Sequence, residues 1–468
     1  MPPPLFSVQD FATMHNSLFP INIIVIIALP ILDTDGRGIR SYLLTRSGLF
    51  PERADLRSTP IPDSKGLSMV TKPESVAAAT KLLFAFALAL VLIASPCAQA
   101  ETFKVVHDFT GGRDGANPVN GFVVDAAGNL YGTASSGGLY GNGVALKINT
   151  QHVETVLYAF KGGQDGSGPQ GFLIFDTAGS LYGTTTAGGA YGAGTVFKIV
   201  GTTESVLYSF GRQNDGASPV AGLAFDTAEN LYGTTSAGGS SGNGTVFELS
   251  PPSQTGGNWT ESVLYSFGTG ADGATPVGGV SFDASGNLYG TTSAGGAYTL
   301  GTVFQLTPGA PWTENKLHDF QNADDGAVPY AGLIADQSGN FYGAATEGGK
   351  NGGGTIFELT PANGSWNFTA IYSVPGWGIS GSFRNVVFDP SSGNLYGTTH
   401  CDGEYNSGTV YKLTPSGRSW DYNLLYNFKG DHDGLYSFSN LVLNQGKLYG
   451  TTKYGGTKGN GVIFEVTP

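Results

Sequence analysis

Short apolar runs separated by glycine-rich turns fill the chain after residue 101. In one stretch these runs are residues 206–210, 222–226, 231–235 and 245–249. Each run is rich in β-branched or aromatic residues and is bounded by Gly, Asn, Asp or Pro, which is typical of β-strands. No segment after residue 101 keeps an apolar period of 3.6 over about ten residues. We therefore expect strands throughout this part of the chain and almost no helix.

A Leu-Tyr-Gly segment and its variants recur seven times along the chain, at intervals of 50 to 57 residues. The tyrosines of the seven copies are Tyr131, Tyr182, Tyr232, Tyr289, Tyr342, Tyr396 and Tyr449. Repeats of this length are typical of solenoids, propellers and arrays. Four strands in each of seven copies predict an all-β, seven-bladed β-propeller with four antiparallel strands per blade. A long solenoid would need polar capping repeats, and the chain has none.

The repeat unit is long and specific. It reads L-Y-S-F, then D-G-A-x-P, then G-L-x-F-D-x-x-G-N-L-Y-G-T-T, and finally G-G-x-x-G-x-G-T-V-F-x-L. Over roughly residues 103–468 this unit resembles the GloVer (Gloeo/Verruco) tandem repeat. The resemblance implies a repeat fold and an exported bacterial protein, in a family that has no agreed activity.

The phase of the repeat predicts how the ring closes. The D-x-x-G-N-L-Y turn resembles that of NHL propellers, in which the G-L-x-F-D strand lies innermost and the L-Y-S-F strand outermost. Residues 103–109 match the L-Y-S-F type, and the last strand, 462–466, is of the T-V-F-x-L type. We therefore expect residues 103–109 to complete blade seven as its outer strand, which removes a pair of exposed edges.

Residues 69–100 have the order of a secretory signal peptide. Lys72 and Lys81 precede the apolar run 82–94, and an Ala-Gln-Ala sequence that ends at Ala100 follows it. The run is too short to span a membrane comfortably. These features predict a protein that is secreted, periplasmic or at the cell surface, with cleavage near Ala100.

The signal peptide divides the chain into two further parts. Residues 1–68 are interpreted as an upstream start or a disordered segment, since a signal peptide normally begins near its own methionine. The alternative is an anchor helix over residues 19–32, which falls short of the roughly 20 apolar residues that a span needs. Residues 101–468 are expected to form a single propeller domain without a membrane span.

The charge of the chain excludes some partners. The formal net charge is −13, and the 15 basic and 29 acidic residues after Ala100 give that part −14. A surface of this sign repels phosphate backbones, so nucleic acid is not expected as a partner. There is no basic stripe for anionic lipid. Cys97 lies in the predicted signal peptide, which leaves Cys401 without an intrachain disulfide partner.

Two sets of loops are expected to share one face of the ring: the D-G-A-x-P loops between blades and the G-G-x-x-G-x-G loops within them. The D-x-x-G-N aspartates on the opposite face are interpreted as turn formers. The D-G aspartates are expected to structure their loops, or alternatively to form a ring of Ca²⁺ sites completed by carbonyl oxygens. They are Asp114, Asp165, Asp215, Asp272, Asp325 and Asp433.

Aromatic residues recur at two places in the repeat. Tyr140, Tyr191, Tyr298 and Tyr405 stand in the G-G-x-x-G-x-G loops. There they either stack on sugar rings or peptide side chains of a ligand or pack against neighbouring loops. Tryptophans recur at the start of the outer strand and are interpreted as packing residues; they are Trp259, Trp312, Trp366 and Trp420.

The sixth repeat departs from the pattern, and departures are where function can lie. Its loops and the next interblade loop bring in unusual side chains, namely Trp377, His400, Cys401, Asp402, Glu404, Tyr405, Asp431, His432 and Asp433. His400, Cys401, Asp402, His432 and Asp433 are candidate ligands for a transition metal. The same side chains are also candidates to supply an acid/base pair. The alternative is neutral drift of a degenerate repeat.

These features favour a non-catalytic binding or interaction module that takes a carbohydrate, peptide or protein ligand through the loop face. The alternative is an extracellular polysaccharide hydrolase or lyase that uses loop carboxylates or a metal near blades six and seven. No Ser-His-Asp order stands out among the five histidines after Ala100. No cofactor is evident, and the expected partner is an extracellular polysaccharide or protein.

Overall fold

The computed structural model of the chain describes residues 102–468, except 255, 376–382 and 418, and three short strands closer to the N-terminus. The chain divides into two compact units, Met1–Pro96 and Cys97–Pro468. No helix in these described ranges is long and apolar enough to cross a membrane.

The first unit contains one small antiparallel sheet. Its strands are β1 (Ala28–Leu32), β2 (Ile39–Thr45) and β3 (Gly48–Phe50), in the order β1-β2-β3. The interpretation of residues 1–68 as an upstream start or disordered segment stays a prediction. The predicted signal peptide, 69–100, lies outside the described residues.

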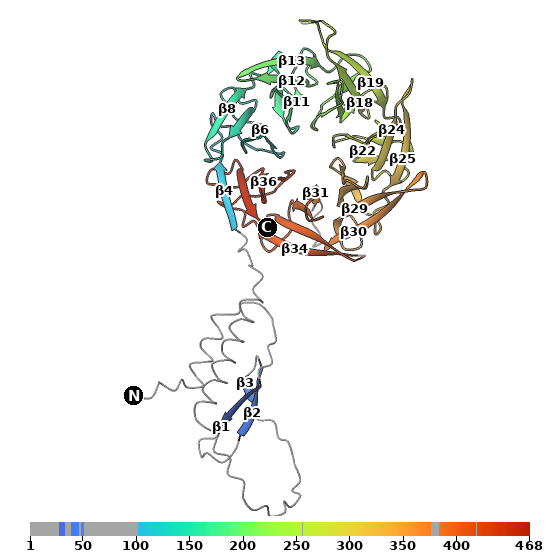
Figure 1. Ribbon diagram of the computed structural model, residues 1–468. Helices are drawn as coiled ribbons and strands as arrows, with labels where there is room; N and C mark the ends of the chain where they lie inside the picture. The colour runs from blue at the N-terminus through green and yellow to red at the C-terminus, as the bar shows by residue number, and fades with distance from the viewer. Residues whose placement is uncertain are drawn as a thin grey trace, which may run out of the picture. The chain divides into compact units, whose positions relative to one another are not determined.

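The second unit is a ring of seven blades (Figure 1). In each blade four antiparallel strands, named A to D, run from the centre outwards. Blade one consists of β5 (Val123–Val124), β6 (Leu130–Ala134), β7 (Val144–Ile148) and β8 (Glu154–Ala159), and blade two of β10 (Ile174–Phe175), β11 (Leu181–Ala187), β12 (Thr195–Val200) and β13 (Thr203–Ser209). Blade three consists of β15 (Ala224–Phe225), β16 (Leu231–Thr235), β18 (Thr245–Ser250) and β19 (Thr260–Ser266), and blade four of β21 (Ser281–Phe282), β22 (Leu288–Thr292), β24 (Thr302–Thr307) and β25 (Thr313–Asp319).

The remaining three blades follow the same order. Blade five consists of β27 (Ile334–Ala335), β28 (Phe341–Glu347), β29 (Gly352–Ala362) and β30 (Ser365–Pro375), and blade six of β31 (Phe383–Phe388), β32 (Leu395–Thr399), β33 (Thr409–Ser416) and β34 (Ser419–Asn427). Blade seven consists of β35 (Val442–Asn444), β36 (Lys447–Thr452), β37 (Val462–Thr467) and β4 (Thr102–Asp108). Blades two and five each add one short strand, β9 (Ser167–Pro169) and β26 (Ala327–Pro329). The predicted fold class, an all-β seven-bladed propeller, is confirmed.

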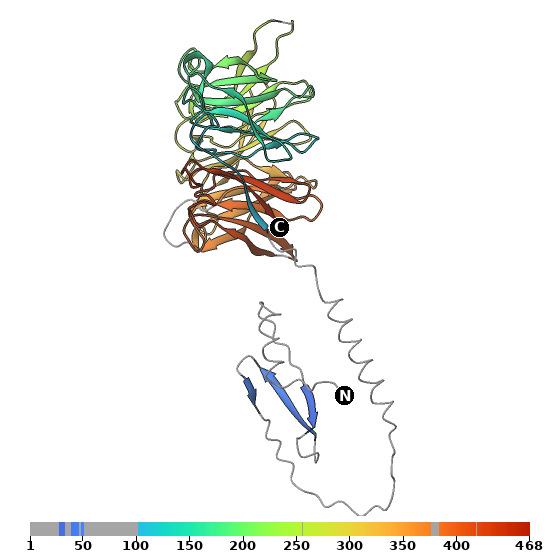
Figure 2. The same ribbon diagram turned by 90° about the vertical axis from the view of Figure 1, so that its left-hand side faces the viewer.

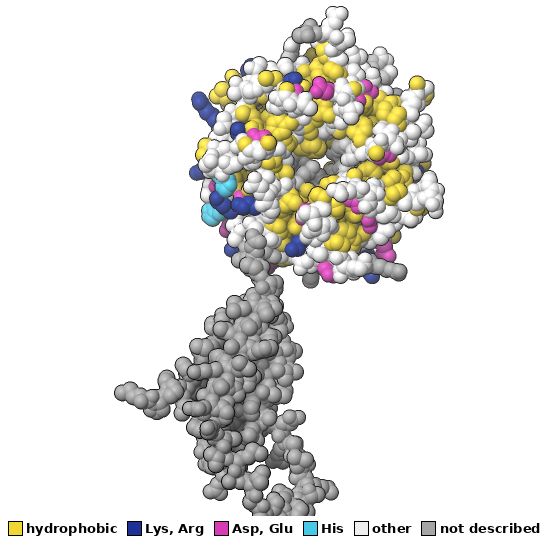
Figure 3. All heavy atoms as spheres, in the orientation of Figure 1, with side chains coloured by type: hydrophobic (Ala, Val, Ile, Leu, Met, Phe, Trp, Pro, Cys, Tyr) yellow, Lys and Arg dark blue, Asp and Glu magenta, His cyan; other side chains and the backbone are white. Residues whose placement is uncertain are grey.

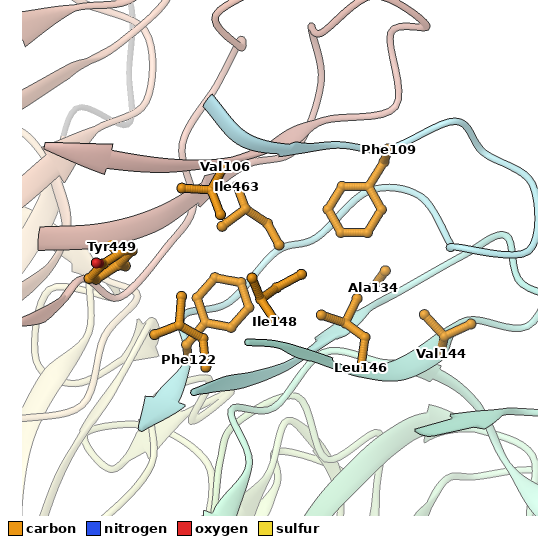
Figure 4. Packing of buried hydrophobic residues seen from close by; sticks show 10 residues of the cluster. Val106, Phe109, Phe122, Ala134, Val144, Leu146, Ile148, Tyr449 and Ile463 are labelled. Atoms are coloured by element: carbon orange, nitrogen blue, oxygen red, sulfur yellow. The ribbon is translucent and has the colours of Figure 1, made fainter. Parts of the chain in front are cut away.

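The ring closes as the repeat phase predicted. Strand β4 pairs with β37, so that Asp108 lies opposite Val462 and Thr102 opposite Thr467. In Figure 1 the first strand of the ring lies beside the red strands of the last repeat. Val106 and Phe109 pack against Ile463 of blade seven and Leu146 of blade one (Figure 4). The N-terminal strand therefore completes blade seven and also contributes to the core between blades seven and one.

Aromatic rings fill the space between the sheets, and a glycine makes room for them. In blade three Phe247 is fully buried and meets Phe210 edge to face, with ring centroids 5.0 Å apart. Gly233 of the Leu-Tyr-Gly motif lies over the same ring, and a Cβ there would stand 2.7 Å from Cζ of Phe247. The motif needs glycine at this position because the aromatic ring already occupies the space of a side chain.

Threonine side chains link neighbouring blades near the centre. Thr234 of strand β16 is buried, and its hydroxyl donates to the carbonyl oxygen of Gly278 in the next blade at 2.9 Å. Thr291 bonds Ala331 in the same way at 2.6 Å. Further links of this kind run from Thr184 to Ala221, from Thr398 to Ser439 and from Thr451 to Asn120. Each link satisfies a buried carbonyl group across a blade boundary.

We expect Thr234→Val to lower the free energy of unfolding by about 1–2 kcal/mol, because it leaves the Gly278 carbonyl without its partner. The matched control is Thr133→Val, since the hydroxyl of Thr133 is buried without a hydrogen-bond partner among the described residues. Chemical denaturation of both variants measures the difference. Equal losses in the two variants would show that the interblade hydrogen bond contributes nothing.

The two faces of the ring differ in what they carry. The turn face carries the A–B turns and C–D hairpins, and the loop face carries the D–A and B–C loops (Figure 2). Figure 3 looks onto the turn face, where hydrophobic side chains gather around the central opening. Pairs such as Tyr182 and Phe225, with ring centroids 5.1 Å apart, contribute to the packing of neighbouring A and B strands.

Candidate functional site

The two loop sets of the loop face are hydrogen-bonded to each other. In blade three Gly216 and Ala217 of the D–A loop form β14 (Gly216–Ala217), which pairs with β17 (Ala237–Gly238) of the B–C loop. In blade four β20 (Gly273–Ala274) pairs with β23 (Ala294–Gly295) in the same way. This pairing joins the entry loop of a blade to its B–C loop. The loop face is consequently a braced surface.

The D-G aspartates brace these loops from within. In the loop that enters blade three, Asp215 accepts a hydrogen bond from the Tyr208 hydroxyl at 2.9 Å and another from the Gly211 amide at 3.0 Å. The same two contacts, a ring seven residues earlier and an amide four residues earlier, recur in other loops. They involve Asp165 with Tyr158 and Lys161, Asp272 with Tyr265 and Gly268, Asp325 with His318 and Gln321, and Asp433 with Tyr426 and Lys429.

The turn aspartates make a different set of contacts on the turn face. Asp226 accepts from the amides of Ala228 and Asn230, at 2.8 and 2.9 Å, and from the Tyr232 hydroxyl at 3.2 Å. Burial raises the pKa of Asp226, but the hydrogen bonds from Asn230 and its neighbours outweigh burial, and the pKa lies below its ordinary value. This geometry is that of a turn-forming aspartate.

Exposed tyrosines are the most prominent side chains of the loop face. Tyr140, Tyr191 and Tyr298 are each 51% exposed, and Tyr405 is 45% exposed. Two further exposed tyrosines of these loops, Tyr330 and Tyr454, were missed by the sequence analysis, because they stand outside the aligned position. By contrast, the outer-strand tryptophans are part-buried packing residues, as Trp259 shows by its edge contact with Tyr182.

The unusual side chains of blade six point in different directions. The His400 ring stacks on Tyr436, with centroids 4.5 Å apart, and meets Phe438 edge to face at 4.3 Å. Cys401 is buried. Asp402 accepts hydrogen bonds from the hydroxyls of Thr399 and Thr409. Burial raises the pKa of Asp402.

The remaining candidates differ from these in exposure and in their contacts. Glu404, Asp431 and His432 are exposed, whereas the carboxylate of Asp433 is bound by the Tyr426 hydroxyl at 2.7 Å. Trp377 lies outside the described residues. Among the side chains that the structure does describe, no three His, Cys, Asp or Glu residues are grouped so that they could hold a metal ion. The structure thus brings His400 to the aromatic residues of the following D–A loop.

Seven blades of four antiparallel strands, closed by the N-terminal strand, define this protein as a β-propeller with a braced loop face. The model of the Gloeobacter/Verrucomicrobia repeat matches residues 94–281, 201–387 and 367–468. The chain therefore belongs to the Gloeobacter/Verrucomicrobia repeat family, which confirms the resemblance drawn from the repeat unit. No curated protein matches the sequence.

Several solved structures are similar to this chain at low sequence identity. The extracellular domain of a B. thetaiotaomicron protein described as a one-component system matches with a TM-score of 0.51 and 10% identity, over 78% of this chain and 39% of that chain. A Lactobacillus plantarum protein matches with a TM-score of 0.47 and 14% identity, over 73% and 99%. A Bacteroides uniformis protein described as a 6-phosphogluconolactonase matches with a TM-score of 0.45 and 14% identity, over 69% and 88%. At such identities the likeness concerns the fold alone.

Proposed function

We propose that this propeller is an exported, non-catalytic binding module whose loop face takes an extracellular polysaccharide or protein. The observation that carries the proposal is the set of exposed tyrosines, of which Tyr140, Tyr191 and Tyr298 stand in B–C loops that pair with the D–A loop of the same blade. An exposed tyrosine offers a flat apolar ring and a hydroxyl to a ligand. Because its side chain has few rotatable bonds, it loses little conformational entropy on binding. Rigid loops lower the cost of ordering the surface when a ligand binds.

Export forms the second part of the proposal and rests on the apolar run 82–94 and the Ala-Gln-Ala sequence that ends at Ala100. Expression of the full chain in a bacterial host with a Sec pathway tests it. We expect protein in the periplasm or the medium whose N-terminal sequence starts at Glu101. Uncleaved protein confined to the cytoplasm would contradict export.

We expect Tyr140→Ala, Tyr298→Ala and Tyr405→Ala, combined in one variant, to weaken binding of a polysaccharide or protein ligand about tenfold or more. The ligand comes from a thermal-shift screen of acidic and neutral polysaccharides and unfolded protein. Ca²⁺ and Zn²⁺ are included, because the metal candidates stay a prediction. Binding of the hits is then measured by calorimetry.

The control for the tyrosine variant is Val153→Ala combined with Val200→Ala, because these side chains are at least as exposed but belong to the C–D hairpins of the turn face. The control is expected to bind like the wild type. Equal binding by both variants would refute the role of the loop face. Release of oligosaccharides from a polysaccharide hit would contradict a non-catalytic function.

A further inference from the structure

A cavity of about 660 Å³ opens at the outer edge of the ring, between the loop that enters blade three and that blade's own outer strand. Residues Arg212 to Asp215 of the D–A loop form one wall, and strand β19 with Trp259 and Glu261 forms the other. Ser240 of the B–C loop also lines it. The volume lies in the range of small-molecule sites.

The cavity depends on residues that differ between blades. At the next junction Lys316 of strand β25 occupies the position of Val263 in β19. Its Nζ donates to the Ala271 carbonyl oxygen at 3.0 Å and pairs with Asp319 at 2.8 Å, so this side chain bridges the corresponding space. The equivalent of Arg212 in that loop is Thr269. The cavity in blade three therefore combines a short side chain at Val263 with an arginine on the loop wall, where the next junction has Thr269.

The cation is held in place by two tyrosines. Nε of Arg212 donates to the Tyr191 hydroxyl at 3.2 Å, and the guanidinium lies over the rings of Tyr191 and Tyr208, 5.4 and 6.0 Å from their centroids. Its two terminal amino groups make no hydrogen bond to any described residue. A guanidinium fixed through Nε presents these two groups side by side, which is the geometry that binds a carboxylate in bidentate fashion.

The opposite wall offers a carboxyl group that lacks a partner. Oε1 of Glu261 is shielded from solvent and has no hydrogen-bond partner among the described residues. Burial, followed by the charge of Asp215, raises the pKa of Glu261 to about 7. Near neutral pH this carboxyl can therefore donate a hydrogen bond as well as accept one, which suits a hydroxyl group. Trp259 and Val263 add apolar surface of the kind that packs on a sugar ring.

We propose that this cavity binds a sugar residue that carries a carboxylate, with the carboxylate on Arg212 and ring hydroxyls on Glu261. The proposal rests on the proposed function and deepens it, since it names a carboxylated sugar residue as the part of the ligand that this cavity holds. A neutral sugar would leave the guanidinium unused, and a phosphate would place its extra charge beside Asp215 and Glu261. A carboxylated sugar offers a carboxylate to Arg212 on one wall and hydroxyl groups to Glu261 on the other.

Calorimetric titration of the full chain with trigalacturonic acid, its methyl ester and 3′-sialyllactose tests the proposal. We expect one of the two acids to bind at least tenfold more tightly than the ester, and more weakly at high salt. The acid that binds identifies the sugar as a uronic or a sialic acid. Binding of neither acid, or equal binding of acid and ester, would overturn the proposal.

We expect Arg212→Gln to lose at least tenfold in affinity for the acid and to bind the ester unchanged. The matched control is Arg113→Gln, because Arg113 is an exposed arginine of the D–A loop before blade one. Arg212 is itself exposed, so melting curves should coincide for wild type and both variants. Equal affinity of Arg212→Gln and wild type would exclude this cavity.

The tyrosine variant separates the two hypotheses, because it leaves Tyr191 and Arg212 intact. If it loses polymer binding while Arg212→Gln keeps it, the carboxylate site is wrong and the loop-face function stands. If Arg212→Gln alone loses binding, the acidic-sugar site stands and the role of the other tyrosines is wrong.

Discussion

Deletion of residues 101–110 is expected to destabilise the propeller by about 5 kcal/mol or more and to lower its melting temperature by about 10 °C. The deletion removes strand β4, which pairs with β37 over six residue pairs. It also removes Phe109, which is fully buried in the core between blades seven and one. A ring without this strand has an unpaired edge on β37. Thermal unfolding followed by circular dichroism measures the loss.

The control for this deletion removes residues 253–257 at the tip of the β18–β19 hairpin, where Ser253, Gln254, Gly256 and Gly257 are exposed. Such a loop tolerates shortening because it contributes little buried surface. An N-terminal deletion that melts at the same temperature as this control would refute closure of the ring by β4. A single substitution, Phe109→Ala, should reproduce a large part of the loss, about 3–5 kcal/mol.

The second large effect is a loss of stability as the pH rises from about 4.5 to 8. Glu204 of strand β13 faces Asp165 and Tyr158 of the preceding junction, with Lys161 nearby. Burial, followed by repulsion from Asp165, raises the pKa of Glu204 to about 8. Its Oε1 is buried without a hydrogen-bond partner among the described residues.

The same arrangement recurs one blade after another. Glu314 faces Asp272, with Lys316 and Asp319 on its own strand, and burial followed by the charge of Asp272 raises its pKa to about 7. Glu261 beside Asp215 and Glu154 beside Asp114 also have raised pKa values. Four outer strands therefore each place a glutamate against the carboxylate that braces the loop before it.

The sign of the pH effect follows from proton linkage. Below about pH 4.5 these glutamates are protonated in both the folded and the unfolded chain, and they contribute no difference. Between about pH 4.5 and the raised pKa values the folded protein keeps protons that the unfolded chain releases. Stability therefore falls over this window and levels off above about pH 8. The effect is opposite to that of Asp226 and its equivalents, whose lowered pKa values favour folding above about pH 4.

Glu204→Gln combined with Glu314→Gln is expected to raise the free energy of unfolding by about 2 kcal/mol at pH 8, after allowance for solvent screening, and to leave it unchanged at pH 4.5. Denaturant titrations at the two pH values measure this. The control, Glu229→Gln with Glu404→Gln, changes two exposed glutamates and should show no such dependence. A double variant that is no more stable than wild type at pH 8 would contradict the buried-carboxyl interpretation.

Much of the fold was predictable because the seven repeats share one pattern of apolar runs and turn residues, so that each copy predicts the same four strands. The outer strand that closes the ring was placed at 103–109, and the structure has it at Thr102–Asp108. The inner strand was less accurate. The run 222–226 became only Ala224–Phe225, because Gly222 lies where neighbouring blades converge, and a Cβ there would stand 2.5 Å from the Phe172 ring. That crowding arises because the blades converge at the centre of the propeller, and it leaves no periodic signal in the sequence of one repeat.

The candidate site was harder to predict, because its contacts join residues that lie far apart in the sequence, as His400 and Tyr436 do. The loop face and its tyrosines followed from the repeat pattern. The aromatic contacts of His400, in contrast, depend on the direction of one side chain in a loop that no longer follows the consensus, and the structure places that ring against Tyr436 and Phe438. The cavity between Arg212 and Glu261 needs the geometry of two successive repeats and the space left by Val263. Neither the contacts of His400 nor the cavity follows from a regular spacing of residues that one sequence alone would show.

The pairing of β4 with β37 also sets the order in which the molecule can be completed. A hydrogen bond joins Thr102 to Thr467, 365 residues further along the chain. Blades one to six can assemble as their strands emerge, but β4 has no partner until the last strand has been synthesised. A chain released early therefore retains an open ring with free edges, which proteases and aggregation can exploit. Ring closure by β4 therefore depends on β37, the partner strand at the other end of the propeller sequence.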